Sequence, residues 1–172
     1  DAQESRGLGD VYKRQVCKGI DAIMVPEAAK AIKEVLVSRA DVITPNTLEA
    51  AYIAGMDKVE TLDEIKEAAA RIQEMGAGYV VIKSGSRNNS DEAVDVLYDG
   101  KNYVVNTEKK IPGCFNHGAG CTFSAAITAG LAKGLSVKDA LAEAKEFITV
   151  ALKNSFRLNQ FSGATDHCKW KK

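Results

Sequence analysis

Hydrophobic and polar positions alternate along the chain with two different periods, one typical of helices and one typical of strands. Apolar residues recur at helical spacing in several stretches, and residues that favour helix caps stand where some of these stretches begin. Asn46 and Ser136 stand at two such starts, and Thr61 and Glu64 have the spacing of a capping box. The pattern predicts helices over Ile23–Ala40, from Asn46 to Gly55, and over Leu62–Met75, Gly118–Lys133 and Val137–Leu152.

Four shorter segments carry the signals of strands. Asp41–Thr44 and Tyr79–Ile82 are apolar runs, and the second has no polar alternation, as expected of a strand buried on both faces of a parallel sheet. Ala93–Tyr98 and Tyr103–Thr107 flank Asp99–Gly100, a dipeptide that favours a hairpin. The order of elements predicts an α/β layer fold with an antiparallel edge, and its four strands make a thin sheet for so many helices.

Composition excludes several classes of protein. The 172 residues suit one domain, and 23 basic residues balance 23 acidic ones, so the chain lacks the basic excess typical of proteins that bind nucleic acid. No apolar run has the length of a membrane span, and the first 15 residues lack the apolar region of a signal peptide. Four cysteines without a Cys-x-x-Cys pair, and only two histidines, argue against a disulfide scaffold or a structural zinc site. These features predict a cytoplasmic protein without nucleic-acid or membrane partners.

The segment 116–126 combines glycines with a cysteine at the start of a predicted helix. Gly118 and Gly120 would let an anion approach the free backbone N–H groups there, which is the geometry of a phosphate site. A thiol at the same place, that of Cys121, would have a lowered pKa and more of the nucleophilic thiolate form. The alternative is a helix that simply begins at glycine and carries a buried cysteine.

Two further loops offer polar groups at strand ends. Asn46 follows a predicted strand and Glu49 lies one helical turn later, so their oxygens could hold Mg²⁺ beside a polyphosphate, or could serve only as a helix cap. Lys83–Ser86 follows the buried strand and could contact phosphate, or could be a plain turn. Because all three loops lie at a strand end or a helix start, together they indicate a nucleotide site.

Four segments in this order resemble the ribokinase-like superfamily, and specifically its hydroxymethylpyrimidine-type vitamin kinases. Asp41–Ala50, Val80–Gly85, Ala93–Gly100 and His117–Ile127 carry the resemblance, which extends over Val16–Gly163. Among these kinases, the chain resembles in particular the bacterial pyridoxal kinases that have two cysteines. The resemblance implies a three-layer α/β/α fold with a mostly parallel sheet, of which residues 16–163 are the C-terminal part, truncated at the N-terminus.

The resemblance also implies roles for individual residues. Asn46 and Glu49 match the element that organises Mg²⁺ and phosphates. Cys121 would attach the pyridoxal aldehyde as a hemithioacetal, and Cys17 matches the second cysteine, which helps to move protons. The anion hole for the transferred phosphoryl group would comprise Gly118, Ala119, Gly120 and Cys121, and the positions that contact ATP would be Lys83, Ser84, Gly85, Ser86, Asp95, Gly120 and Ala125.

The activity implied is the ATP- and Mg²⁺-dependent phosphorylation of the hydroxymethyl group of pyridoxal and related B6 vitamers, giving pyridoxal 5'-phosphate. The alternatives are a kinase of hydroxymethylpyrimidine or its phosphate in thiamine synthesis, and an inactive fragment that keeps part of a nucleotide site. Dimers are usual in the family, so we expect a homodimer of the full-length enzyme. Residues 1–15 resemble nothing in the family and are expected to be an artefactual leader, residues 164–172 a tail, and the chain by itself inactive.

Overall fold

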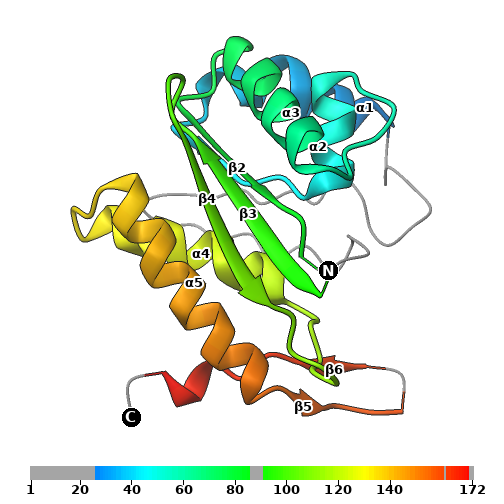
Figure 1. Cartoon of the computed structure of the whole chain (residues 1–172), viewed down its shortest axis with the longest axis vertical. Coiled ribbons are helices and arrows are strands. Elements are labelled where there is room, and N and C mark those ends of the chain that lie inside the picture. The colour runs from blue at the N-terminus through cyan, green and yellow to red at the C-terminus, as the bar shows by residue number, and fades with distance from the viewer. Residues whose placement is uncertain (1–25, 86–90, 161, 171–172) are drawn as a thin grey trace. The chain divides into compact units, whose positions relative to one another are not determined.

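The computed structural model describes residues 26–85, 91–160 and 162–170, so the leader 1–15, Cys17 and Ser86 lie outside the described residues. The chain divides into two compact units. We call Gln15–Lys110 the sheet unit and Ile111–Lys172 the helical unit, and each is described by itself (Figure 1).

The sheet unit contains the helices that the cap signals predict. α2 spans Thr47–Ala54, begins at the N-cap Asn46 and ends at Gly55, whose positive φ of 66° is the left-handed conformation that glycine adopts freely. α3 spans Leu62–Glu74 and begins at the predicted capping box of Thr61 and Glu64. Hydrogen bonds from the backbone N–H groups of Thr61 and Glu60 hold the pKa of the Glu64 carboxyl below its ordinary value. Both caps confirm what the sequence predicts.

The first predicted helix is less regular than its apolar spacing suggests. Within the described residues it begins as α1, Pro26–Ala31, continues as a π-helical turn, η1, over Ile32–Leu36, and ends as a 3₁₀ turn, η2, over Val37–Arg39. The N–H of Val37 donates to the carbonyl of Ile32, five residues earlier, which is the bond of a π-helix.

The sheet has the strand order β1-β2-β3-β4, with β1 over Val42–Ile43, β2 over Tyr79–Lys83, β3 over Glu92–Tyr98 and β4 over Tyr103–Lys109. β1 and β2 are parallel, whereas β3 pairs antiparallel with β2 and with β4. The predicted hairpin and antiparallel edge are therefore confirmed. Among the four strands of this sheet one pair is parallel and two pairs are antiparallel, so the described part of the sheet is mixed.

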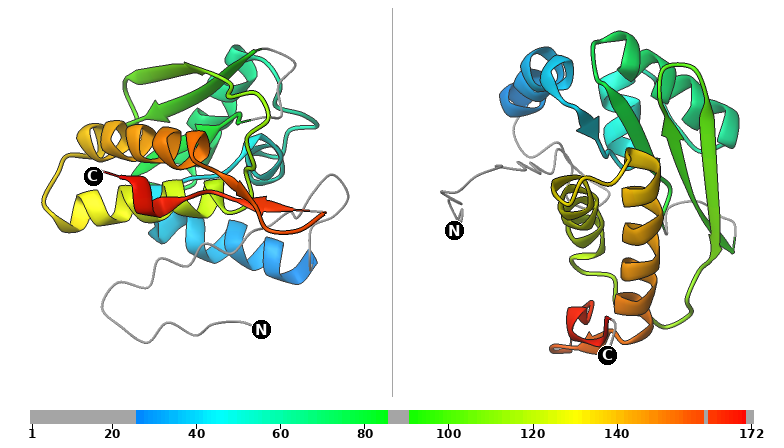
Figure 2. Two further views of the ribbon diagram at one scale, coloured as in Figure 1. Left: turned by 90° about the horizontal axis from the view of Figure 1, so that it is seen from below. Right: turned by 90° about the vertical axis from the view of Figure 1, so that its left-hand side faces the viewer.

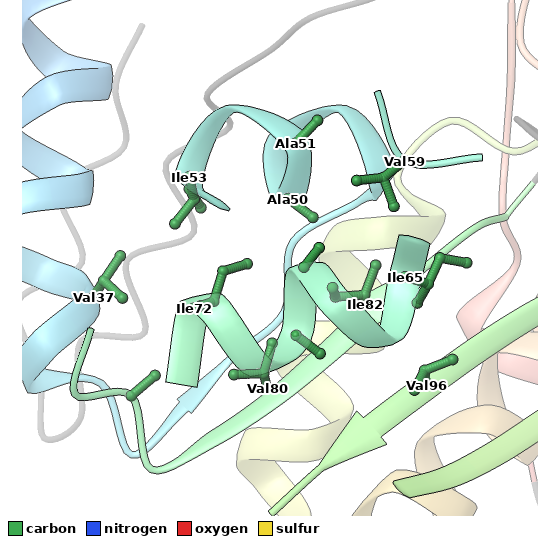
Figure 3. Packing of buried hydrophobic residues seen from close by; sticks show 13 residues of the cluster. Val37, Ala50, Ala51, Ile53, Val59, Ile65, Ile72, Val80, Ile82 and Val96 are labelled. Atoms are coloured by element: carbon green, nitrogen blue, oxygen red, sulfur yellow. The ribbon is translucent and has the colours of Figure 1, made fainter. Parts of the chain in front are cut away.

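Apolar side chains of α2, α3 and the sheet form the core of this unit. Ile72 of α3, Val80 and Ile82 of β2 and Val96 of β3 are completely buried, and they point into one cluster in Figure 3. Because residues alternate between the faces of a strand, Val81, Lys83 and Asp95 lie on the opposite face of the sheet from this cluster. One face of the sheet thus carries the core, and the other carries the polar residues described below.

The helical unit is built on two helices that pack side by side, α4 over Ala119–Ala132 and α5 over Val137–Lys153 (Figure 2). Gly130 permits their close approach, because a Cβ atom built on it would lie 2.8 Å from the Cβ of Ala140. A small antiparallel pair follows, β5 over Phe156–Arg157 and β6 over Gly163–Ala164, which the sequence pattern does not predict.

Residues 164–170, within the segment expected to form a tail, pack against the rest of the helical unit. A 3₁₀ turn, η3, spans His167–Lys169 and contacts α5, beside which it lies in Figure 2. The ring of Phe147 on α5 lies edge-on to Trp170, with centroids 5.3 Å apart, and the N–H of Asp166 donates to the carbonyl of Ala151. The polar sequence of this segment gives no sign of these contacts. In the described parts of the chain, no helix is long and apolar enough to span a membrane.

Candidate active site

The register of the strands brings three of the predicted site residues into one line across the sheet. Asn46 is bridged to Lys83, Lys83 is paired with Asp95, and Asp95 is paired with Asn106 of β4. Side chains of directly paired residues lie on the same face of a sheet, so these four belong to one polar row. We call Asn46, Lys83, Asp95 and Asn106 the cross-strand row. Asp95 is the most buried of them, with 5% of its surface exposed.

Glu49 combines a helix-capping role with an oxygen that has no partner. Its Oε2 accepts a hydrogen bond of 2.8 Å from the N–H of Asn46, while Asn46 Oδ1 accepts one of 3.0 Å from the N–H of Glu49. Only 5% of Glu49 is exposed, and its Oε1 has no hydrogen-bond partner among the described residues. The capping box is therefore real, but it uses only half of the carboxylate. A buried carboxylate oxygen without a partner is costly unless a cation or water meets it.

The loop after β2 continues the pairing of the strand for one residue. Ser84 is buried, its N–H donates to the carbonyl of Val94, and its Oγ accepts from the N–H of Val94, both at 2.8 Å. Gly85 follows with a φ of 54° and is exposed. Ser84 is thus held by β3, which accounts for its burial, and Gly85 has the left-handed backbone conformation that favours glycine.

The predicted phosphate loop lies in the helical unit. Gly118 is the N-cap of α4 with a φ of 85°, and no side chain caps this helix. The N–H of Ala119 donates to the carbonyl of Asn116 at 3.0 Å. A helix start with uncapped N–H groups and little side-chain bulk suits an anion.

Cys121 occupies the first turn of the same helix and is exposed, so the alternative of a buried cysteine is wrong. Ala125, one turn further along α4, is exposed as well. Cys17, the expected partner of Cys121, lies outside the described residues. The two groups of predicted residues belong to different units: the cross-strand row and Glu49 to the sheet unit, and Gly118–Cys121 with Ala125 to the helical unit.

Two polar residues near these groups are not among those that the sequence singles out. Asn106 looks like an ordinary strand residue. It lies two residues after Val104, on the same half-buried face of β4, and a polar amide at such a position is a signal that could have identified it. His167 falls in the expected tail, but its Nε2 lies 2.8 Å from Thr122 Oγ1 in the first turn of α4. No local pattern could have shown that contact.

Comparison with known proteins identifies the family. The family described as phosphomethylpyrimidine kinase matches residues 15–166. This chain belongs to that family. The match covers the cross-strand row, Glu49 and the start of α4, so each of these features lies in the part that family members share.

Family members of two specificities are similar to the chain. The pyridoxine kinase of Bacillus subtilis is 52% identical over 152 residues, which cover 88% of this chain and 56% of that protein. The hydroxymethylpyrimidine/phosphomethylpyrimidine kinase of the same organism is 36% identical over 157 residues, which cover 91% of this chain and 58% of that one. The chain thus spans little more than half the length of these relatives.

A solved structure shows the same fold. The pyridoxal kinase from Staphylococcus aureus in complex with AMP-PCP and pyridoxal superposes with a TM-score of 0.83 at 38% identity, over 88% of this chain and 56% of that chain. The likeness confirms the ribokinase-like α/β fold that the motifs imply. It also shows that a protein of this fold binds an ATP analogue and pyridoxal together.

Proposed function

We propose that this chain supplies the nucleotide and phosphoryl-transfer residues of an ATP-dependent kinase that phosphorylates the hydroxymethyl group of pyridoxal. The observation that carries the proposal is the cross-strand row, which gathers Asn46, Lys83 and Asp95 on one face of the sheet. The similarity to pyridoxine and pyridoxal kinases, at up to 52% identity, supports the choice of substrate.

The chemistry of phosphoryl transfer agrees with the types of group present. The enzyme must hold the donor and acceptor in line and stabilise charge on the transferred group, and it needs little covalent chemistry at phosphorus. Lys83 supplies a positive charge for the phosphates of ATP. The N–H groups that begin α4 at Gly118–Cys121 are of the kind that stabilises the transferred phosphoryl group.

The side-chain oxygens of Glu49 and Asn46 suit a magnesium ion. Glu49 Oε1 is a buried carboxylate oxygen without a partner among the described residues, which is the hard oxygen ligand that Mg²⁺ prefers. Asn46 Oδ1 already accepts one hydrogen bond but keeps a second lone pair, so it could serve directly or through water. The ion would neutralise charge on the phosphates of ATP. Glu49 would therefore hold the ion, and the capping box fixes the position of its carboxylate.

Cys121, together with Cys17 as its expected partner, favours pyridoxal over hydroxymethylpyrimidine as the acceptor. An exposed thiol in the first turn of a helix has the reactivity to form a hemithioacetal with the aldehyde of pyridoxal, which would hold the hydroxymethyl group for in-line transfer. Hydroxymethylpyrimidine has no aldehyde. It remains the second candidate because the matching family is described as phosphomethylpyrimidine kinase.

The test compares both acceptors in the full-length protein that carries this sequence. Purified protein is incubated with ATP, MgCl₂ and either pyridoxal or hydroxymethylpyrimidine, and the phosphate esters are separated by chromatography. We expect pyridoxal 5'-phosphate to form with the higher kcat/KM. Faster phosphorylation of hydroxymethylpyrimidine would assign the protein to the second function, and no phosphate ester from either acceptor would overturn both.

A further inference from the structure

The structure places the C-terminal segment against the loop that precedes α4. Ala164 is bridged to His117, and the N–H of Thr165 donates to the carbonyl of His117. A Cβ atom on Gly163 would overlap the ring of Phe115, so the segment and the loop are in close contact there. The loop that precedes α4 thus packs against a segment that lies more than 40 residues later in the chain. Thr122 and His167, for example, are 45 residues apart in the sequence.

One side chain connects this segment to the first turn of α4. His167 Nε2 lies 2.8 Å from Thr122 Oγ1 and 3.1 Å from Thr165 Oγ1. Both threonines are nearly buried, with exposed fractions of 8% and 6%, whereas His167 itself is exposed. The imidazole is in turn held beside the ring of Phe147, with centroids 6.0 Å apart.

Thr122 follows Cys121 directly, and its N–H donates to the carbonyl of Gly118 at 2.9 Å. The hydroxyl that His167 holds therefore belongs to the residue that closes the first turn of α4. We propose that His167 is a positioning residue: through Thr122 it fixes the turn whose N–H groups stabilise the transferred phosphoryl group. This role rests on the proposed function, whereas the contact itself does not.

Paired substitutions distinguish the contact from general packing. In His167→Gln the side-chain amide nitrogen can occupy the place of Nε2 and keep the bond to Thr122, whereas the shorter side chain of His167→Asn reaches only the place of Nδ1. Thr122→Val removes the hydroxyl at nearly constant shape, and Thr122→Ser keeps it. Each pair contains one variant that breaks the hydrogen bond and one that preserves it.

The first measurement is hydrogen exchange at single amides in the full-length protein that carries this chain. We expect the amides of Thr122 and Phe123 to exchange roughly fivefold faster in His167→Asn and Thr122→Val, because a net hydrogen bond has about that effect on an equilibrium. Exchange in α5 should not change, and His167→Gln and Thr122→Ser should behave like the unmodified protein. Equal exchange in all variants, or faster exchange throughout the helical unit, would overturn the proposal.

The second measurement is turnover of ATP and pyridoxal. We expect kcat to fall about fivefold or more in His167→Asn and to recover in His167→Gln, with the KM for both substrates unchanged, because the turn acts on the transferred group. An unchanged kcat in His167→Asn would overturn the positioning role. If the unmodified protein does not phosphorylate pyridoxal at all, the proposed function fails, and hydrogen exchange alone then decides whether His167 fixes the turn.

Discussion

Substitution of Gly118 by alanine tests whether the backbone conformation of the loop, and not only its composition, creates the anion site. Gly118 has a φ of 85°, and the nearest atom to a Cβ built there is Thr165 Oγ1 at 3.7 Å, which is an ordinary contact. Alanine would therefore fit in space but not in conformation. An alanine in the left-handed conformation destabilises the folded state by about 1–2 kcal/mol. Alanine also lowers the conformational entropy of the unfolded chain, which offsets about 0.4–1 kcal/mol of this cost.

We expect Gly118→Ala to lower the free energy of unfolding by about 1 kcal/mol, measured by urea denaturation. Gly113 provides a matched control, because it has a φ of 70° and a Cβ built there would meet no atom within 4 Å, yet it lies outside the first turn of α4. Gly113→Ala should cost a similar free energy. Only Gly118→Ala should also weaken the binding of AMP-PCP and lower kcat, since relaxation of the strain at residue 118 turns the following N–H groups away.

Two results would refute this reasoning. If Gly118→Ala is as stable as the unmodified protein, residue 118 does not need the left-handed conformation. If Gly113→Ala weakens AMP-PCP binding as strongly as Gly118→Ala does, the loss reflects a general loosening of the helical unit. Isothermal titration calorimetry on both variants decides between local and general effects.

Three further predictions concern the thiol, the buried carboxylate and the helix contact. Cys121→Ala should reduce kcat/KM for pyridoxal at least about tenfold more than for pyridoxine, which has no aldehyde, and equal losses in steady-state rates would exclude the hemithioacetal. Glu49→Gln keeps an acceptor for the cap but removes the charged cation ligand. The affinity of the variant for AMP-PCP should be about tenfold lower than that of the unmodified protein in MgCl₂ and equal to it in EDTA. An equal loss of affinity in EDTA would argue against a metal role. Gly130→Ala should lower the free energy of unfolding by about 1 kcal/mol, because overpacking against Ala140 exceeds the gain in helix propensity. Ala140→Gly in the same chain should restore part of that loss, and thermal melts that show no coupling between the two positions would contradict the close contact.

Local signals in the sequence determined most of the secondary structure. The caps at Asn46 and Thr61 and the hairpin at Asp99–Gly100 appear as predicted, because each depends on atoms within about four residues of one another along the chain. The start of α4 at Gly118 was predictable for the same reason. The irregular turn over Ile32–Leu36 was not, because its apolar spacing is compatible with a regular helix.

Which polar groups lie together depends on how the distant parts of each unit pack. Asn106 joins Lys83 and Asp95 through the register of three strands, and register depends on pairing partners that no single strand specifies. The hydrogen bond between His167 and Thr122 joins residues 45 apart in the chain. Glu49 Oε1 has no partner in the described part of the chain because packing buries it, while Oε2 of the same carboxylate caps a helix. The kinds of chemical group, and the helices and strands that carry them, could therefore be inferred from local sequence patterns. Their neighbours were decided by packing, because contacts between distant residues form only when the whole unit folds.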